Sequence, residues 1–264
     1  MKREAPLLAY FGHHKAASTW IRDIVQDACE VSHLRCVYVH NPRQFDADLK
    51  GFVEREQMDF LIHANANMEH VKDILGVLRG FHVVRDPRDM AVSAYFSHLH
   101  SHPPQEFPML VGDREKLKRT TKDEGLLLEL SRPYVYGAMS RWDYSLPNVL
   151  ELRMEDMVRD QRESFCRVFA FLGLVEGHPD SWQGEGSRGL PMLTPGLVAE
   201  IVDRNDFAKK TGGRRPGEED VQSHYRKGVP GDWRNHFAEE HKEYVKKNLN
   251  GLLVKLGYEK DDTW

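Results

Sequence analysis

Short apolar runs alternate along the chain with longer stretches in which apolar residues recur every three or four positions. The runs at 7–11, 37–39, 60–63, 81–84 and 149–152 predict buried strands, and the stretches at 18–28, 71–78, 86–99, 165–172 and 237–256 predict helices. This alternation predicts a three-layer α/β fold, with a mainly parallel central sheet flanked by helices. In such folds ligands bind beyond the carboxyl ends of the strands. Because the pattern shows no linker between compact halves, we expect one domain over residues 1–264.

Composition narrows the classes of protein that fit this pattern. The chain has 264 residues and a formal net charge of −4, which argues against a nucleic-acid-binding surface. Three cysteines, Cys29, Cys36 and Cys166, lack the spacing of a zinc site and favour reduced thiols. The first apolar run, 7–11, is too short for a signal-peptide core or a membrane span. We therefore expect a cytoplasmic protein with no membrane or nucleic-acid partner.

The segment 12–20 lies between the first predicted strand and the first predicted helix. Its small residues let backbone N–H groups approach an anion, and the helix N-terminus behind them adds partial positive charge. Lys15, Ser18 and Thr19 add an ammonium group and two hydroxyl groups. The segment is not a Walker A loop, because a second glycine before the lysine is missing. Read alone, it also fits an ordinary strand–helix turn with a solvent-facing lysine.

Two further segments carry phosphate-binding residue types. Arg85 ends the fourth predicted strand and Ser93 lies on the next helix, so a bidentate cation and a hydroxyl group come together there. Arg226, Lys227 and Gly228 set two cations beside a residue that allows close backbone approach. The local alternatives are a helix start with Asp86 as cap and Pro87 in its first turn, and a loop capped by Asp232 or Asn235.

Taken in this order, the three segments resemble the sulfotransferases that use 3′-phosphoadenosine 5′-phosphosulfate (PAPS). The family's Pro-Lys-Ser-Gly-Thr-Thr-Trp loop corresponds to His14-Lys15-Ala16-Ala17-Ser18-Thr19-Trp20. Its Arg-Lys-Gly-x-x-Gly-Asp-Trp signature is matched throughout from Arg226 to Trp233, and its 3′-phosphate segment by Arg85 and Ser93. The resemblance implies a P-loop NTP hydrolase-like sulfotransferase fold. It also implies transfer of a sulfuryl group from PAPS to a hydroxyl or amine acceptor, with 3′-phosphoadenosine 5′-phosphate (PAP) as product and no metal.

The same resemblance implies a role for each matched residue. Lys15 stabilises the departing phosphate, while Ala16, Ala17, Ser18 and Thr19 hold the 5′-phosphate and Trp20 lies near the adenine. Arg85, Ser93, Arg226, Lys227 and Gly228 bind the 3′-phosphate, and Phe207 is a second adenine contact. His63, at the end of the third predicted strand, is the expected general base, with His13 and His14 as the next candidates.

Several features leave alternatives open. His98, His100 and His102 are metal ligands, solvent-facing residues or lining of the acceptor cleft. The aromatic residues from Tyr95 to Tyr144, Phe107 among them, belong to the core or to the acceptor pocket. The charged, glycine-rich stretch 209–220 predicts a mobile loop. The alternative functions are a non-catalytic PAP or PAPS sensor and a nucleotide kinase-like phosphoryl transferase. A small molecule is the expected acceptor, and homo-oligomerisation stays open.

Overall fold

The computed structural model describes residues 5–103, 109–182 and 192–264. The chain divides into two compact units, each built from two separate segments. The first unit contains Met1–Val84 and Arg141–Asp206, and the second contains Arg85–Ser140 and Phe207–Trp264. The expectation of one domain over 1–264 stays a prediction.

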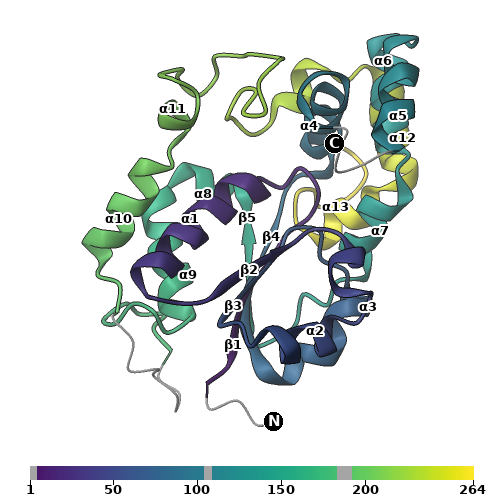
Figure 1. Ribbon diagram of the computed structural model, residues 1–264. Coiled ribbons are helices and arrows are strands. Elements are labelled where there is room, and N and C mark those ends of the chain that lie inside the picture. Colours follow the sequence, from purple (N-terminus) through teal and green to yellow (C-terminus); the bar gives the residue numbers. More distant parts are fainter. Residues whose placement is uncertain (1–4, 104–108, 183–191) are drawn as a thin grey trace. The chain divides into compact units, whose positions relative to one another are not determined.

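The described part of the first unit contains a five-stranded parallel sheet (Figure 1). Its strand order is β2-β3-β1-β4-β5, so the first strand lies at the centre. The strands are β1 Leu7–Phe11, β2 Cys36–Val39, β3 Phe60–His63, β4 Leu78–Val84 and β5 Val149–Arg153. All four strand pairs run parallel, which confirms the predicted sheet.

Helices cover both faces of this sheet (Figure 1). The helices α2 Leu49–Glu56 and α3 Met68–Val71 lie on one side, and α1 Ser18–Val31, α9 Gln161–Phe171 and α10 Pro195–Arg204 on the other. Side chains alternate along a strand, so Leu7, Ala9 and Phe11 share one face and enter a single buried cluster with Phe45 and Trp142. The three-layer architecture is therefore confirmed.

One row across the sheet carries polar side chains at the carboxyl ends of the strands. Phe11 pairs with His63 on one side and with His82 on the other, and His82 pairs with Glu151. Paired residues of parallel strands point to the same face, so His63, His82 and Glu151 all lie on the face of Phe11. The register thus gathers titratable groups at the edge where such sheets bind ligands.

Three predicted helices differ from the observed ones. The predicted helix 71–78 is wrong beyond residue 71: α3 ends there, a 3₁₀ turn covers Lys72–Val77 and includes Gly76, and Leu78 already begins β4. The predicted helix 86–99 is α4 Pro87–Phe96 followed by one π-helical turn, Ser97–Ser101. The predicted helix 237–256 is two helices, because Leu249 leaves helical backbone geometry between them. They are α12 Glu239–Asn248 and α13 Asn250–Lys255.

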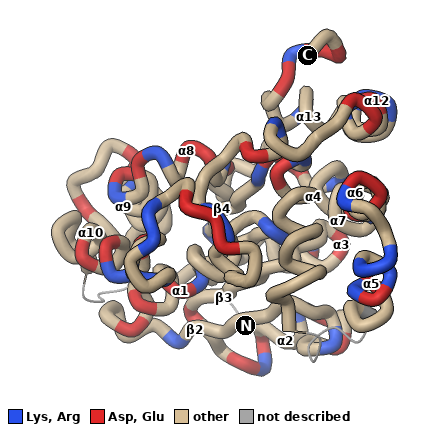
Figure 2. The backbone as a smooth tube through the Cα atoms, turned by 90° about the horizontal axis from the view of Figure 1, so that it is seen from above, with Lys and Arg blue, Asp and Glu red and all other residues tan. Residues whose placement is uncertain are grey.

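Helices make up most of the second unit. Besides α4, α12 and α13 it contains α5 Met109–Lys118, α6 Lys122–Leu130 and the short α11 Phe207–Lys210. Helix α7 Pro133–Arg141 also belongs to it, except for its last residue, Arg141, which is assigned to the first unit. Helix α4 packs on α6 where Gly125 leaves room for Tyr95, since a Cβ atom at that glycine would lie 2.5 Å from the tyrosine ring. Charged residues of both signs lie along α5, α6 and α12 (Figure 2).

Among the described residues, no helix is both long enough and apolar enough to cross a bilayer.

Candidate active site

The loop between β1 and α1 has an unusual backbone. Lys15 and Ala17 have positive φ angles of 64° and 58° on either side of Ala16. Alternation of left-handed and other residues points successive N–H groups into one concavity, which is a common way to bind an anion. Ala17 is also the N-cap of α1, where no side chain caps the helix and no acidic residue stands in the first turn. The helix N-terminus therefore keeps its partial positive charge for a ligand.

Some side chains of this segment are partly exposed at the start of α1, and one packs into the core. Ser18 and Thr19 are the first two residues of α1, as predicted, and both are half-buried. The ring of Trp20 is buried and meets Phe165 of α9 edge-on, with ring centroids 5.3 Å apart. Its predicted contact with adenine stays a prediction.

In the second unit, α4 begins as its sequence predicts. Arg85 directly follows β4, the Asp86 side chain accepts a hydrogen bond from the Arg88 backbone N–H, and Pro87 occupies the first turn. Ser93 is half-buried two turns along the helix. The local helix-cap reading and the phosphate-site reading are therefore compatible.

Asp89 ties α4 to the third segment, a link that the sequence analysis missed. Its carboxylate accepts the backbone N–H of Gly231 at 2.5 Å and of Trp233 at 2.9 Å. Burial raises the pKa of Asp89, and the nearby charge of Arg85 and these hydrogen bonds partly offset the effect. Within the second unit the Arg85 segment and the Arg226 segment are thus brought together.

Two further contacts define the third segment. The guanidinium group of Arg226 lies 4.6 Å from the ring centroid of Phe96 on α4, a cation–π contact. Gly228 has a φ of 70°, and a Cβ atom there would lie 2.5 Å from the ring of Phe207. Phe207, which the sequence analysis placed near the nucleotide, therefore packs directly against the Arg-Lys-Gly turn.

The cations of this segment are paired with carboxylates. Arg226 pairs with Glu219 and, at 2.5 Å, with Asp232, while the Lys227 ammonium lies 2.6 Å from the other Asp232 oxygen. Asn235 and His236 complete the partners of Asp232. Burial alone would raise the pKa of Asp232, but hydrogen bonds from these neighbours lower it well below the usual value.

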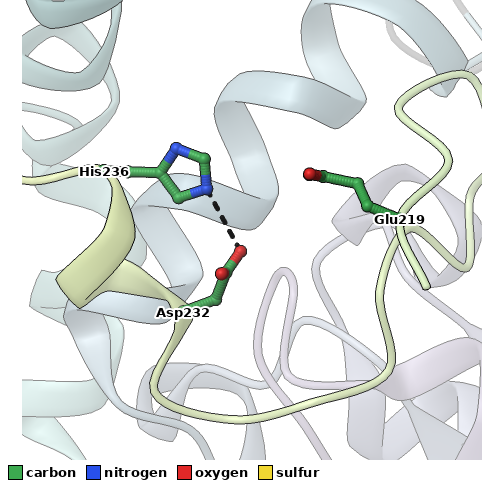
Figure 3. A group of neighbouring side chains, drawn as sticks. All are labelled: Glu219, Asp232 and His236. Atoms are coloured by element: carbon green, nitrogen blue, oxygen red, sulfur yellow. Dashed lines mark hydrogen bonds and ion pairs between the residues drawn. The ribbon is translucent and has the colours of Figure 1, made fainter. Parts of the chain in front are cut away.

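Glu219, Asp232 and His236 also offer three atoms at the spacing of metal ligands (Figure 3). Arg226 and Lys227 already neutralise both carboxylates, so a metal ion would have to compete with two cationic side chains. We therefore interpret the cluster as an ion-pair network. The prediction of a metal-free reaction stays a prediction.

The loop 209–220 is connected to this network. Backbone hydrogen bonds run from Gly217 to Lys227 and from Asp220 to Arg226, and the Arg214 guanidinium donates to the carbonyl groups of Tyr225 and Arg226. Glu219 reaches Arg226 from this loop. A movement of the loop would therefore act directly on the predicted phosphate-binding cations.

His63, the predicted base, is the last residue of β3 and is fully buried. Its carbonyl group accepts the N–H of Gly12 at 2.9 Å, which places it beside the anion-binding loop. Neither ring nitrogen has a hydrogen-bond partner among the residues that the structure describes. Burial, together with His70, His13 and His40, lowers the pKa of His63 to about 3, so its ring is neutral.

His13 lies inside the loop and is the end of a buried hydrogen-bond chain. Its Nε2 lies 2.8 Å from Nε2 of His82, whose Nδ1 lies 2.6 Å from a carboxylate oxygen of Glu151. The indole N–H of Trp142 donates to the other Glu151 oxygen at 2.8 Å, and the Trp142 ring stacks on His82. Burial, with a smaller contribution from His82, lowers the pKa of His13 well below its usual range. His14, the remaining candidate, is half-buried in the same loop.

The three histidines near the end of α4 have separate partners. His98 bonds Glu129 at 2.9 Å, His100 bonds Gln222 at 3.2 Å, and the His102 carbonyl group accepts a hydrogen bond from Arg114. They do not form a metal-ligand group among the described residues. Of the aromatic residues from Tyr95 to Tyr144, Tyr95, Tyr136 and Trp142 are buried. Phe107 lies outside the described residues.

Comparison with known proteins identifies the family. The sulfotransferase domain family matches residues 77–257, more than half of the chain, and the chain belongs to this family. The matched stretch includes Arg85, Ser93 and the Arg226 segment, whereas the loop around Lys15 precedes it.

Individual relatives agree with this assignment. The chain is similar to flavonol 3-sulfotransferase of Flaveria bidentis, with 29% identity over 138 residues, which is 47% of this chain and 40% of that protein. Its fold is similar to mouse sulfotransferase SULT7A1 complexed with PAP, with a TM-score of 0.59, 18% identity, and coverage of 96% of this chain and 89% of that one. It is also similar to retinol dehydratase in complex with androsterone and the inactive cofactor PAP, with a TM-score of 0.52, 16% identity, and coverage of 100% and 84%. The predicted sulfotransferase fold is thereby confirmed.

Proposed function

We propose that the protein transfers a sulfuryl group from PAPS to a hydroxyl or amine group of a small molecule and releases PAP. The observation that carries this proposal lies in the second unit. There Asp89 holds the Arg-Lys-Gly turn against the helix that carries Ser93, just after Arg85. The two segments that Asp89 joins supply three cations, Arg85, Arg226 and Lys227, and the Ser93 hydroxyl group, and these groups together would suit a phosphate dianion.

The residues present fit a nucleotide 3′-phosphate. Arg226 and Lys227 share the carboxylates of Glu219 and Asp232, so an incoming phosphate exchanges with partners that already have its charge and hydrogen-bonding pattern. Gly228 has no Cβ atom, so its backbone can pack against the Phe207 ring and approach a bound anion closely. Phe207 supplies an aromatic surface for a base.

The residues of the first unit fit a 5′-phosphosulfate. The left-handed residues Lys15 and Ala17 and the uncapped start of α1 form a backbone cradle without acidic side chains in the first turn. Ser18 and Thr19 add hydroxyl donors. Trp20, buried against Phe165, anchors the first turn of the helix in the core.

Each group then has a chemical task. PAPS, when bound, supplies an activated sulfuryl group on a phosphate leaving group. The Lys15 ammonium stabilises the charge that develops on that leaving group, as donors in preorganised sites do. The backbone of Ala16 and Ala17 with the two hydroxyl groups orients the reacting atoms in line. A neutral histidine beside the loop, for which His63 is the first candidate by resemblance, accepts the proton of the acceptor.

The two alternatives use the same groups differently. A non-catalytic PAP or PAPS sensor would need the cations but not Lys15 or a base. A nucleotide kinase-like transferase would need a Walker A loop and a magnesium carboxylate, whereas here the loop replaces the required glycine pattern. The family match favours sulfuryl transfer over both, and the 3′-phosphate chemistry of the second unit argues further against the kinase-like alternative.

Calorimetric titration with PAP, with ADP as control, tests the nucleotide assignment. We expect PAP to bind at least about tenfold more tightly than ADP, since only PAP carries the 3′-phosphate. The variant Arg226→Ala should remove this preference. Equal binding of both nucleotides by the unmodified protein would contradict the proposal.

Transfer itself is tested by incubation with PAPS and a panel of phenols, alcohols and amines that includes the flavonol quercetin. PAP formation that depends on an acceptor supports catalysis, whereas tight PAP binding without transfer to any member favours the sensor. The acceptor is proposed only as a small molecule. The three cysteines are free thiols, which supports the proposed cytoplasmic location.

A further inference from the structure

The chain from Trp142 through Glu151 and His82 to His13 is buried, continuous and unexplained by the nucleotide site. His82 is fully buried, and His13 is 2% exposed. The Trp142 indole nitrogen lies 2.8 Å from one Glu151 oxygen, and the other Glu151 oxygen lies 2.6 Å from Nδ1 of His82. Nε2 of His82 lies 2.8 Å from Nε2 of His13. Polar groups inside a sheet core are costly unless satisfied, and this chain satisfies them in one fixed order. Its outer end lies within the loop that contains Lys15.

Two tautomeric arrangements satisfy the chain equally well. When Glu151 is ionised, it accepts the Nδ1 proton of His82, and Nε2 of His82 accepts the Nε2 proton of His13. Nδ1 of His13 then has a free electron pair. When Glu151 is protonated it donates to His82, His82 donates to His13, and Nδ1 of His13 carries a proton. One proton thus enters or leaves at His13 while the charge changes only on Glu151.

We propose that Glu151, His82 and His13 form a proton relay that withdraws the acceptor's proton through His13 during sulfuryl transfer. The acceptor O–H bond breaks and its proton moves to Nδ1 of His13. The Nε2 proton of His13 moves to Nε2 of His82, and the Nδ1 proton of His82 moves to Glu151. The acceptor oxygen bonds to sulfur, and the electron pair of the broken S–O bond stays on the 5′-phosphate. PAP, the sulfated acceptor and a neutral Glu151 balance the reactants.

The surroundings favour this route over His63 alone. His63 would have to become an imidazolium ion inside the core, where neither nitrogen has a partner among the described residues, and its pKa lies near 3. His13 avoids that cost because no imidazolium ion accumulates in the relay. The only charge that changes is that of the Glu151 carboxylate, whose side chain is 25% exposed and accepts a hydrogen bond from the Trp142 indole.

The groups around Glu151 set the pH at which the relay works. Burial raises the pKa of Glu151 to about 8, the Trp142 hydrogen bond opposes this, and the charge of Asp143 adds to it. His82 and Tyr144 are the other titratable groups that face the carboxylate. A base whose pKa lies close to neutral pH is effective in proton transfer. Glu151 therefore loses its proton as the pH rises through about 8, and the relay can then accept the proton of the acceptor.

The test is the tautomeric state of His13, measured by ¹⁵N NMR on full-length protein labelled in histidine, with and without PAP. The His13→Gln variant assigns the signals. We expect the proton of His13 to move from Nδ1 to Nε2 as the pH passes the pKa of Glu151, and Glu151→Gln to abolish this change. A fixed tautomer in the unmodified protein across that range would overturn the relay.

Asp143→Asn is the matched control, because Asp143 is exposed and asparagine keeps the oxygen that accepts from Ser145. Removal of its charge lowers the pKa of Glu151, so the midpoint of the His13 change should move to lower pH while the relay stays intact. A midpoint that moves to higher pH would contradict control of His13 by Glu151. This readout is also available if Glu151→Gln folds poorly.

The catalytic meaning of the relay rests on the proposed sulfuryl transfer, but the tautomer measurement does not. With an acceptor identified by PAP formation, kcat should rise through the same midpoint, and Glu151→Gln should lower it about 10²-fold or more with PAP affinity unchanged. Unaltered kcat in that variant would overturn the catalytic role. Failure of PAP binding in the unmodified protein would instead contradict the proposed function.

Discussion

The two predicted anion sites differ in how they are prepared for a ligand. The loop around Lys15 relies on backbone geometry: left-handed residues and a helix start without acidic residues in its first turn. The turn around Arg226 relies on side chains that carboxylates already occupy. The first site stores backbone strain, whereas the cations of the second must exchange carboxylate partners for a phosphate. We therefore expect the first to control rate and the second to control affinity.

The largest expected effect is a loss of kcat without a comparable loss of PAP affinity when Lys15 is replaced. Lys15→Ala removes the charge that stabilises the leaving phosphate, so kcat should fall about 10²–10³-fold, the loss typical of one preorganised donor. PAP binding, measured by calorimetry, should change only a few-fold. Lys50→Ala, an exposed lysine on α2, is the control. Normal turnover of Lys15→Ala would remove the distinction between the two sites.

The second effect concerns affinity. Arg226→Ala should weaken PAP binding roughly 10- to 100-fold, because hydrogen bonds to charged groups contribute about 1.5–3 kcal/mol. At saturating PAPS, kcat should change much less. Arg226→Lys keeps the charge without the bidentate geometry and should lie between the two. A larger loss in kcat than in affinity would reverse our assignment.

A smaller effect tests the exchange of partners directly. Glu219→Gln removes a carboxylate that competes with the phosphate for Arg226, so PAP should bind up to about fivefold more tightly, equivalent to roughly 1 kcal/mol. Glu218→Gln, the adjacent position that bonds the backbone of Arg215 instead, serves as the control. Weaker PAP binding by Glu219→Gln would show that Glu219 helps to hold the nucleotide.

The smallest effect concerns strain in the backbone-based site. Ala17 has a φ of 58°, a conformation that costs a residue with a Cβ atom about 1–2 kcal/mol. Glycine, the residue of the family loop at this position, removes that strain but gains entropy in the unfolded chain, so Ala17→Gly should raise the thermal midpoint by only a few degrees or less. Ala16→Gly, at a position without positive φ, should lower it. Equal shifts would show that Ala17 is not strained.

The sequence predicted what depends on local pattern. The five strands lie within a few residues of their predicted ends, because buried strands of a parallel sheet are nearly continuous apolar runs. The cap at Asp86 and the position of Arg85 after β4 are likewise local properties. Helix 71–78 failed because Leu75 and Leu78 continue the apolar spacing while the backbone around Gly76 has already left the α-helix.

Pairs between distant segments were beyond prediction. Asp89 reaches Gly231, Glu219 reaches Arg226, and His82 reaches Glu151 only once strand register and loop path are known. A weak signal existed for the relay: His82 and Glu151 are polar residues inside apolar strand runs. Such residues in a buried strand require a partner, although their sequence does not name it.

The discontinuous first unit has a consequence for synthesis on the ribosome. When residues up to Val84 have emerged, four strands can pair, but β4 remains an open edge until Val149–Arg153 is made. Open edges of apolar strands are sites of aggregation, so the nascent chain carries this hazard through the translation of more than sixty intervening residues. Pairing of β5 closes the edge and, in the same step, brings Glu151 to His82. The addition of β5 therefore both covers the exposed edge of β4 and completes the hydrogen bond between Glu151 and His82.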